Sequence, residues 1–266
     1  MGHVTPLAIS GIGKAGAAGE EVLTVENLVK IYKGADCKAL SGLNITVRRG
    51  EIFGLLGPNG AGKTTAIKIM STLLSATAGR VQIYGTDALK HPGRIRSLLG
   101  LVPQNIALYG GLTARENLRY FGTICGLSGQ ILKDRVGFCL EMVGLEGRAD
   151  QRVSTYSGGM KRRANLAAGI LHDPRILFLD EPTVGIDAQS RNMILEKLSL
   201  LKQNGTAIVY TTHYMDEAER LCDRVAIMDE GRIIAEGSPQ EMADRPPGHA
   251  GLGELFLALT GKDLRD

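Results

Sequence analysis

The sequence predicts an α/β fold, and three observations carry this prediction. A short apolar run, Ile52 to Leu56, leads into a glycine-rich loop and then into a helical stretch at 66–70. Further short apolar runs typical of buried strands recur at 98–102, 176–179 and 207–210. The stretch 113–171 shows helical spacing of apolar residues instead. The order indicates an α/β body that carries an inserted block of helices.

The composition is that of an ordinary globular protein. Its 266 residues are 44% hydrophobic and 22% charged, with a formal charge of +3. This mild basicity would favour phosphate or an anionic membrane surface but is too small to decide between partners. We expect no nucleic-acid partner. The four cysteines are widely spaced without a C-x-x-C pair, which favours reduced thiols in a cytoplasmic setting over a disulfide framework or a zinc site. No apolar run approaches 18 residues, and residues 1–20 lack a signal-peptide pattern.

The loop after the first buried strand fits the phosphate-binding pattern G-x-x-x-x-G-K-[ST] from Gly57 to Thr64. Its glycines lack Cβ atoms, so the backbone can turn tightly and approach an anion closely. The loop N–H groups and the N-terminus of the following helix then face the phosphates. Lys63 supplies a mobile charge for the β and γ phosphates, and Thr64 offers a hydroxyl to Mg²⁺. The plain alternative is a glycine-rich turn that binds nothing.

The chain before and after this loop supplies short strands. Residues 22–25 are expected to form a strand, and the alternation of Leu43, Ile45 and Val47 predicts a half-buried one. Arg49-Gly50 is expected to turn that strand back into the phosphate-loop strand as a hairpin. Residues 81–85 are typical of another strand and turn.

The later part of the chain returns from helices to strands. Thr113 to Glu116 form a capping box at the start of the helical block. Residues 225–228 and 232–235 predict a closing hairpin around Glu230-Gly231. Residues 246–248, Pro-Pro-Gly, are a natural linker to a last helix at 252–259, which contacts either the body or a second subunit.

A second group of candidate residues follows the strand 176–179, which ends in Asp180 and Glu181. The carboxyl end of a buried parallel strand lies at the crevice where α/β proteins bind ligands. Asp180 can hold Mg²⁺ directly or through water, and Glu181 can polarise an attacking water as a general base. Without the phosphate loop upstream, a solvated turn would be the simpler interpretation.

Four other positions are ambiguous by themselves. Gln104 can be a surface turn residue, His213 a structural histidine at a strand end, and Tyr32 either a core aromatic or a platform for an adenine. Ser157 can cap the helix that follows it, and the pair Gly158-Gly159 leaves that helix N-terminus open to an anion. The chain would then hold two phosphate sites. Both can bind the same nucleotide only if they come from two different subunits or if the two sites move together.

In this set and order the motifs resemble the nucleotide-binding subunits of ABC transporters, over roughly residues 22–237. The segment from Gly57 to Thr65 matches Walker A, and the pair Asp180-Glu181 matches Walker B with its catalytic glutamate. Gln104 matches the Q-loop, residues 157–159 the signature, residues 184–187 the D-loop, and His213 the switch histidine. The resemblance assigns catalytic roles to Glu181, His213 and Lys63, and Mg²⁺ binding to Thr64, Gln104 and Asp180. ATP contacts are assigned to Tyr32, Gly57, Asn59, Gly60, Gly62, Lys63, Thr64, Thr65, Gln104, Ser157, Gly158 and Gly159.

The resemblance further implies a P-loop NTPase core with an antiparallel β subdomain and an inserted α-helical signature subdomain. The ATPase domain would span residues 21–240, with the helical subdomain at about 105–172. A flexible tail at 1–20 and a C-terminal extension at 241–266 would flank it. The cofactors implied are ATP and Mg²⁺. The partners are a second nucleotide-binding subunit, in a homodimer or heterodimer, and a multi-span permease on a separate chain. The protein would then lie peripherally on the cytoplasmic face of the membrane, and the permease would dock around 104–118.

The signature departs from the commonest form, LSGGQ, because Tyr156 replaces Leu and Met160 replaces Gln. This variant is similar to the daunorubicin-exporter-like and sodium-exporter-like branch, which implies an exporter. Two alternatives remain: a soluble ABC-type ATPase acting on ribosomes or DNA, and a phosphotransferase on the same loop. The single Walker A motif and the absence of sustained heptads argue against the former, and the signature argues against the latter.

Overall fold

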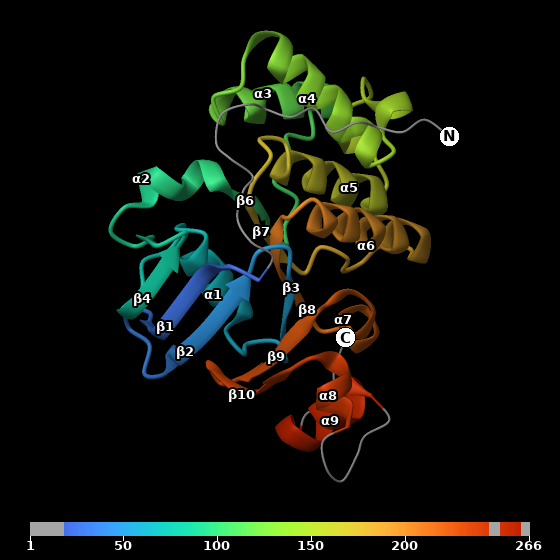
Figure 1. The fold of residues 1–266 in the computed structure, drawn as a ribbon. Coiled ribbons are helices and arrows are strands. Elements are labelled where there is room, and N and C mark those ends of the chain that lie inside the picture. The colour runs from blue at the N-terminus through green and yellow to red at the C-terminus, as the bar shows by residue number, and fades with distance from the viewer. Residues whose placement is uncertain (1–18, 245–250, 262–266) are drawn as a thin grey trace.

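The computed structural model describes residues 19–244 and 251–261, and two β-sheets organise them (Figure 1). The larger sheet has the strand order β10-β9-β3-β8-β7-β6. Its strands run parallel to their neighbours except for the antiparallel pair of β9 and β10. The strands are β3 (Ile52–Leu56), β6 (Leu99–Val102), β7 (Ile176–Asp180), β8 (Ala207–Thr212), β9 (Arg224–Asp229) and β10 (Arg232–Gly237).

The smaller sheet is antiparallel, with the order β2-β1-β4-β5. The first strand continues well past the predicted residues 22–25, because register shifts around Leu28 let it bend and keep pairing with two neighbours. The strands are β1 (Glu21–Ile31), β2 (Lys38–Arg48), β4 (Ala78–Ile83) and β5 (Thr86–Asp87).

The expected hairpin between β2 and the phosphate-loop strand is wrong. A turn does form, with the amide of Glu51 donating to the Arg48 carbonyl (3.2 Å), but it directs the chain from one sheet into the other. Strand β3 instead lies between two parallel partners, pairing Phe53 with Val209 and Arg224. All five of its residues are buried, as in a central parallel strand covered on both faces, whereas β2 alternates. The predicted closing hairpin of β9 and β10 is confirmed.

The helices lie in three groups around the sheets (Figure 1). The helix after the phosphate loop and the short helix before β6 pack with the antiparallel sheet, three helices separate β6 from β7 along the chain, and the remaining four pack against the opposite face of the larger sheet. The helices are α1 (Lys63–Met70), α2 (Pro92–Ile95), α3 (Ala114–Ile124), α4 (Gly129–Met142), α5 (Gly158–Gly169), α6 (Ala188–Gln203), α7 (Met215–Leu221), α8 (Pro239–Ala243) and α9 (Leu252–Thr260). None of these described helices is long and apolar enough to cross a bilayer.

Two hydrophobic cores lie on opposite faces of the larger sheet. On β7, Leu177 and Leu179 belong to the core shared with α3 to α9, while Ile176 and Phe178 belong to the core shared with α1 and the antiparallel sheet. This alternation follows from the two-residue period of a strand. Both faces of β7 are therefore packed against a core. This packing holds the carboxyl end of the strand in place, where Asp180 lies in the candidate site.

The helix starts follow the predicted caps. Thr113 and Glu116 form the capping box of α3, and the Ser157 hydroxyl accepts from the amide of Met160 at the start of α5. Helix α9 packs on the body, with Phe256 fully buried and the amide of Leu252 donating to Glu219 Oε1 on α7 (2.6 Å). Most of the expected tail at 1–20 and the expected linker at 246–248 lie outside the described residues.

Candidate functional site

The phosphate loop forms a cavity of about 170 Å³ at the carboxyl end of β3. Its wall consists of residues 58–65 together with Ala39 and Glu181. Gly62 has a φ of +103°, and a Cβ there would lie 2.5 Å from the Ala39 carbonyl oxygen, so the position requires glycine. Asn59 and Gly60 are exposed at the rim. The predicted strand, loop and helix context is therefore present and open to a ligand.

Lys63 is the buried cation of this cavity. Its ammonium donates to the carbonyl oxygens of Gly57 (2.6 Å) and Pro58 (3.1 Å) and lies 3.5 Å from Glu181 Oε1. Burial lowers the pKa of Lys63, and the nearby Glu181 carboxylate opposes that shift. The lysine is thus held by the loop that would surround a phosphate.

Asp180 meets the loop from the other side. Its Oδ1 accepts from the hydroxyl groups of Thr64 (3.2 Å) and Thr211 (3.0 Å). Burial raises the pKa of Asp180 above its usual value, against the lowering effect of those two hydrogen bonds. A buried carboxylate beside a hydroxyl offers the hard oxygen ligands that Mg²⁺ prefers. Among the described residues no three His, Cys, Asp or Glu side chains form a metal cluster, so phosphate oxygens and water would complete such a site.

Glu181 is where three other predicted residues converge. Its carboxylate accepts from Gln104 Nε2 (3.1 Å) and lies 3.4 Å from His213 Nδ1, in addition to Lys63. The residue has a φ of +48°, which is rare for a side chain of this size and typical of a functional position held by its surroundings. His213 Nδ1 is buried without a hydrogen-bond partner in the described structure. The arrangement places a carboxylate, an amide and an imidazole around one point near the phosphate cavity.

Tyr32 lies beside the phosphate-loop helix. Its hydroxyl is 3.2 Å from Thr65 Oγ1, and the side chain is 43% exposed. A half-exposed ring next to a phosphate site is available for stacking on a base. The alternative that Tyr32 is a core aromatic is wrong.

The signature residues stand apart from this cavity. Ser157 and Gly158 are exposed at the N-terminus of α5, and neither lines the phosphate cavity. Gly159 is buried, and a Cβ there would lie 2.2 Å from Ser190 Oγ on α6. Close packing of two helices therefore requires Gly159, a reason that the sequence pattern does not reveal.

The unusual signature residues also have local roles. Tyr156 is buried, and its hydroxyl donates to the Arg148 carbonyl (2.7 Å). Met160 is partly buried against the larger core, in the position where the common pattern has Gln. Both side chains therefore add to the larger core, and Tyr156 also binds the segment before α5 to the turn at Arg148.

Two contributors to the site were not predicted from the sequence. Thr211, one of two threonines that end β8, accepts from the amide of Glu181 (3.0 Å) as well as donating to Asp180. Arg162 on α5 donates to the carbonyl oxygens of Gln104 and Val184. The polar end of an otherwise apolar strand is a signal for Thr211, whereas the three basic residues after the signature give no means of choosing Arg162.

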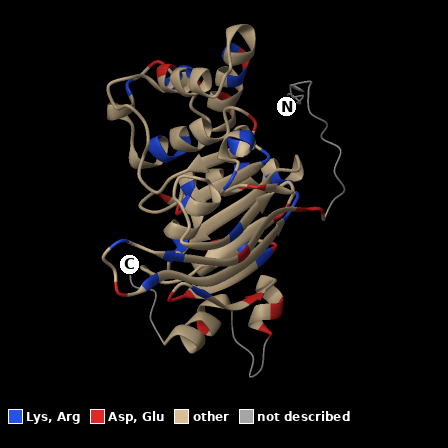
Figure 2. Ribbon diagram, turned by 90° about the vertical axis from the view of Figure 1, so that its left-hand side faces the viewer, with Lys and Arg blue, Asp and Glu red and all other residues tan. Residues whose placement is uncertain are grey.

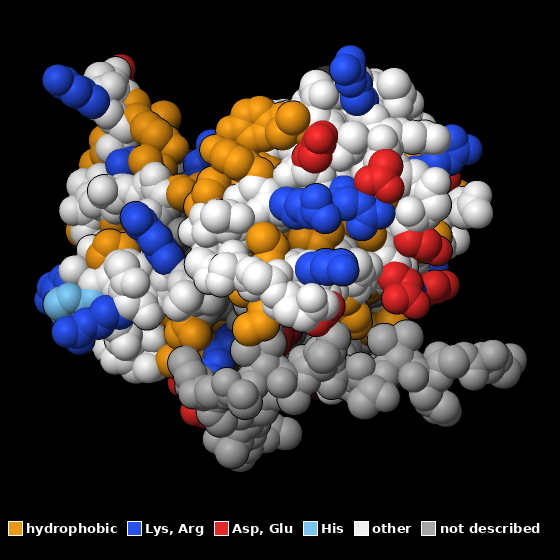
Figure 3. Space-filling model, turned by 90° about the horizontal axis from the view of Figure 1, so that it is seen from above, with side chains coloured by type: hydrophobic (Ala, Val, Ile, Leu, Met, Phe, Trp, Pro, Cys, Tyr) orange, Lys and Arg blue, Asp and Glu red, His pale blue; other side chains and the backbone are white. Residues whose placement is uncertain are grey.

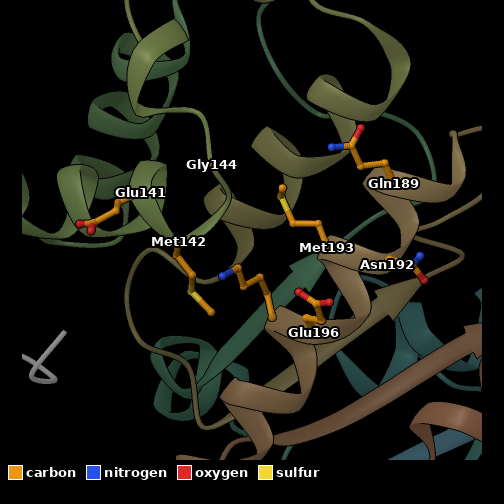
Figure 4. A pocket seen from close by; sticks show the side chains of 8 residues that line it. Glu141, Met142, Gly144, Gln189, Asn192, Met193 and Glu196 are labelled. Carbon is orange, nitrogen blue, oxygen red and sulfur yellow. The ribbon is translucent and has the colours of Figure 1, made fainter. Parts of the chain in front are cut away.

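A larger hollow of about 570 Å³ lies elsewhere, between the end of α4 and the outer face of α6 (Figure 4). Met142 lies on its α4 side, and Met193 and Glu196 on its α6 side. None of the predicted site residues lines it. The smaller cavity is the functional candidate, because the buried charges and the strained carboxylate gather there and not in the larger hollow.

Fold and site together define a nucleotide-binding protein with a P-loop. The ABC transporter family model matches residues 40–184. The linearmycin resistance ATP-binding protein of Bacillus subtilis (strain 168) is 43% identical over 243 residues, 89% of this chain and 78% of that protein. The Nod factor export ATP-binding protein I of Ralstonia nicotianae is 43% identical over 227 residues, 85% of this chain and 70% of that protein. The chain belongs to the ABC transporter family, as an ATP-binding subunit.

Solved structures agree with this assignment. The ATP-binding subunit of an ABC transporter aligns with 31% identity and a TM-score of 0.81, covering 90% of this chain and 99% of the other. A dimeric ATP-binding cassette in a post-hydrolysis state with ADP and Pi aligns with 27% identity and a TM-score of 0.75, covering 81% and 98%. The predicted α/β P-loop core with its antiparallel and helical subdomains is confirmed, and the chain is an ATPase.

Proposed function

We propose that this chain is the ATPase of an exporter, working at a head-to-tail interface between two nucleotide-binding subunits and driving a separate membrane permease. One observation carries the assignment of roles: the Glu181 carboxylate is contacted at once by Lys63, Gln104 and His213. These residues come from separate segments of the chain and have no common structural purpose outside a phosphate site. Export is supported by relatives named for drug resistance and for Nod factor export.

ATP binding is proposed to use the phosphate cavity and Tyr32. The glycines and Asn59 would surround the phosphates with backbone N–H groups, and Thr65 would sit beside the ring of Tyr32. Lys63 would exchange its two carbonyl partners for the β and γ phosphates. Each exchange replaces a neutral acceptor by a charged one, which favours the bound state.

The Mg²⁺ site is proposed at Thr64 and Asp180, with Gln104 next to it through Glu181. Their hard oxygen atoms fit this ion, and its charge would offset the burial of the Asp180 carboxylate. When bound, Mg²⁺ would neutralise charge on the phosphates during transfer.

Hydrolysis is proposed to need residues of two subunits. Glu181 would accept a proton from the attacking water, and His213 would hold the γ phosphate and that water in place. Ser157, Gly158 and the N-terminus of α5 would contact the γ phosphate of the other subunit, because they are exposed and remote from their own phosphate cavity. Binding would then close the dimer, and loss of the γ phosphate would reopen it.

The permease is proposed to dock on the helical part of the chain, on the cytoplasmic face of the membrane. Tyr109 and Tyr120 are half exposed there and lie edge to face, 5.3 Å apart, with Phe121 beside them. Figure 3 looks down on this side of the molecule and shows hydrophobic side chains gathered on it. Tyr109 lies within the predicted segment 104–118, and the other two aromatic residues follow shortly after it. Aromatic clusters of this kind are frequent at protein interfaces.

The distribution of charge supports a protein partner over a nucleic acid. Lys and Arg alternate with Asp and Glu along the strands and helices in Figure 2, with no basic stripe in that view. The net charge of +3 is also small for a phosphate-backbone binder. We therefore propose a partner set of permease and second ATPase subunit, without nucleic acid.

The test is capture of partners from detergent-solubilised membranes of the source cells with the Glu181→Gln chain and ATP, alongside the Lys63→Met chain as a matched control. We expect Glu181→Gln to retain ATP, to form a stable dimer on a sizing column and to recover a multi-span protein. Lys63→Met should show none of these three behaviours. Recovery of ribosomal or DNA-bound proteins in place of a membrane protein would favour the soluble ABC-type alternative, and steady-state turnover by Glu181→Gln would contradict the role of this glutamate.

A further inference from the structure

Glu217 on α7 is a fully buried acid outside the phosphate cavity, with 1% of its surface exposed. Its Oε2 accepts three hydroxyl groups, from Tyr210 (2.6 Å), Thr183 (2.8 Å) and Thr212 (3.1 Å). Its Oε1 lies 3.3 Å from Arg191 Nε on α6. A buried carboxylate is costly unless such partners surround it, so this group of residues forms one connected unit.

Tyr210, one of the three hydroxyl donors, is itself fully buried beside Glu217. The pKa of Tyr210 is raised well above its usual value by burial and by the adjacent Glu217 carboxylate. The phenol therefore stays protonated and donates. Three hydroxyl groups therefore donate to one oxygen atom of Glu217, and the Arg191 guanidinium lies beside the other.

The partners of Glu217 belong to the three segments that surround the proposed hydrolysis site. Thr183 is the second residue after Glu181, and Thr212 directly precedes His213. Thr212 Oγ1 also accepts from the amide of Tyr214 (3.0 Å), which fixes the backbone on the far side of the histidine.

The third segment is the start of α6. The amide of Arg191 donates to the carbonyl of Asp187, which is the last residue of the D-loop and the N-cap of this helix. The Arg191 guanidinium also lies 4.9 Å from the ring of Tyr214, in cation–π contact. One carboxylate thus joins the segments after Glu181, around His213 and after the D-loop.

We propose that Glu217 is a positioning residue for ATP hydrolysis, which sets the distance between Glu181 and His213 by holding both of their segments. The inference rests on the roles proposed above for these two residues. Their contact, 3.4 Å between His213 Nδ1 and Glu181 Oε1, is not itself a hydrogen bond. Its length depends on how the two segments are held, and a displacement of about 1 Å in such a site can cost roughly 100-fold in rate.

A pair of variants at Thr183 isolates the link to the general base. Thr183→Val removes the hydroxyl and keeps the shape, whereas Thr183→Ser keeps the hydroxyl and removes a methyl group. We expect Thr183→Val to lower kcat by about tenfold with ATP affinity within about twofold of the unmodified chain, and Thr183→Ser to retain kcat. A kcat that falls equally in both variants, or in step with the folded fraction measured by circular dichroism, would mean that the site is only structural and would overturn the proposal.

Variants on α7 test the carboxylate directly, with Asp216→Asn as the control, because Asp216 is exposed on the same helix. We expect Glu217→Gln to lower kcat by about tenfold or more at unchanged ATP affinity, and Asp216→Asn to leave kcat unchanged. The double variant Thr183→Val with Glu217→Gln should be no slower than Glu217→Gln alone, since both break one linkage.

Glu181→Gln, assayed in the same series, distinguishes a failure of the Glu217 proposal from a failure of the proposed function. If Glu181→Gln is inactive while Glu217→Gln and Thr183→Val keep full kcat, the Glu217 proposal fails and the proposed function stands. If Glu181→Gln itself turns over ATP at the unmodified rate, the proposed function fails first.

Discussion

The Nζ atom of Lys63 lies 3.5 Å from Oε1 of Glu181, while its hydrogen bonds go to the Gly57 and Pro58 carbonyl oxygens. The cation that would meet the phosphates and the carboxylate that would activate water are therefore neighbours in the structure. Both are almost fully buried, at 5% and 6% exposure. The lysine holds its own loop in the shape that a phosphate requires.

Replacing this lysine should weaken nucleotide binding strongly. Lys63→Met removes charge-assisted hydrogen bonds to phosphate, each worth about 1.5–3 kcal/mol, so we expect ATP affinity to fall about 10- to 100-fold. Equilibrium titration with a fluorescent ATP analogue measures the change. Lys68→Met is the matched control because Lys68 is exposed on the same helix, and it should bind ATP normally. Equal affinities for the two variants would contradict the assignment of Lys63.

Asp180 should make the ligand-free protein less stable at neutral pH. Its pKa is raised on folding, chiefly by burial, so the contribution of this group to stability is full below its unfolded value of 3.8 and is lost as the pH rises through the folded value. Asp180→Asn keeps an oxygen acceptor for Thr64 and Thr211 without the charge. We expect this variant to be more stable than the unmodified protein at pH 7.

The measurement is urea unfolding of the ligand-free protein across pH 4 to 7. The stability advantage of Asp180→Asn should shrink as the pH falls toward the unfolded pKa of Asp. Asp216→Asn, the same change at an exposed position, should show no such trend. An Asp180→Asn variant less stable than the unmodified protein at pH 7 would refute the electrostatic argument.

Much of the phosphate site could be predicted from the sequence because its chemistry is local. Residues 57–65 fix their own backbone shape, and the apolar strand before Asp180 places that residue at a sheet end without knowledge of its neighbours. The pairing of β3 was not predictable in this way. A turn at Arg49-Gly50 is compatible with a hairpin and also with a connection from one sheet to another. Only the long-range pairing of β3 with β8 and β9 shows that β2 and β3 belong to different sheets.

Glu217 was also missed, although the sequence holds a signal for it. With Ala218 and Leu221 it falls on the apolar stripe of α7, where an acid is unexpected. The partners that make its burial tolerable lie on β8, on α6 and after β7, and no spacing in the sequence connects them. Contacts among three distant segments are a property of the fold and not of any motif.

The Tyr156 hydroxyl should stabilise the fold by binding the segment before α5 to the turn at Arg148. Tyr156→Phe removes the donor to the Arg148 carbonyl (2.7 Å) and leaves the ring, so we expect a loss of about 1 kcal/mol in the free energy of unfolding. Chemical denaturation measures it. Tyr109→Phe serves as the control, since Tyr109 is 51% exposed and should change stability by less than about 0.5 kcal/mol. Equal effects would mean that this hydrogen bond contributes nothing to stability.

Helix α9 should behave as part of the ATPase body. Phe256 is fully buried in the larger core, and the start of α9 is tied to α7 through Glu219, five residues after Tyr214, which flanks His213. Phe256→Ala would leave a cavity, so we expect a loss of about 3–5 kcal/mol in the free energy of unfolding. Leu257→Ala is the matched control, because Leu257 is 42% exposed on the same helix and should cost less than about 0.5 kcal/mol. A dimer contact would give the opposite pattern: Leu257→Ala would weaken ATP-dependent dimerisation on a sizing column, and Phe256→Ala would leave the stability of the monomer unchanged.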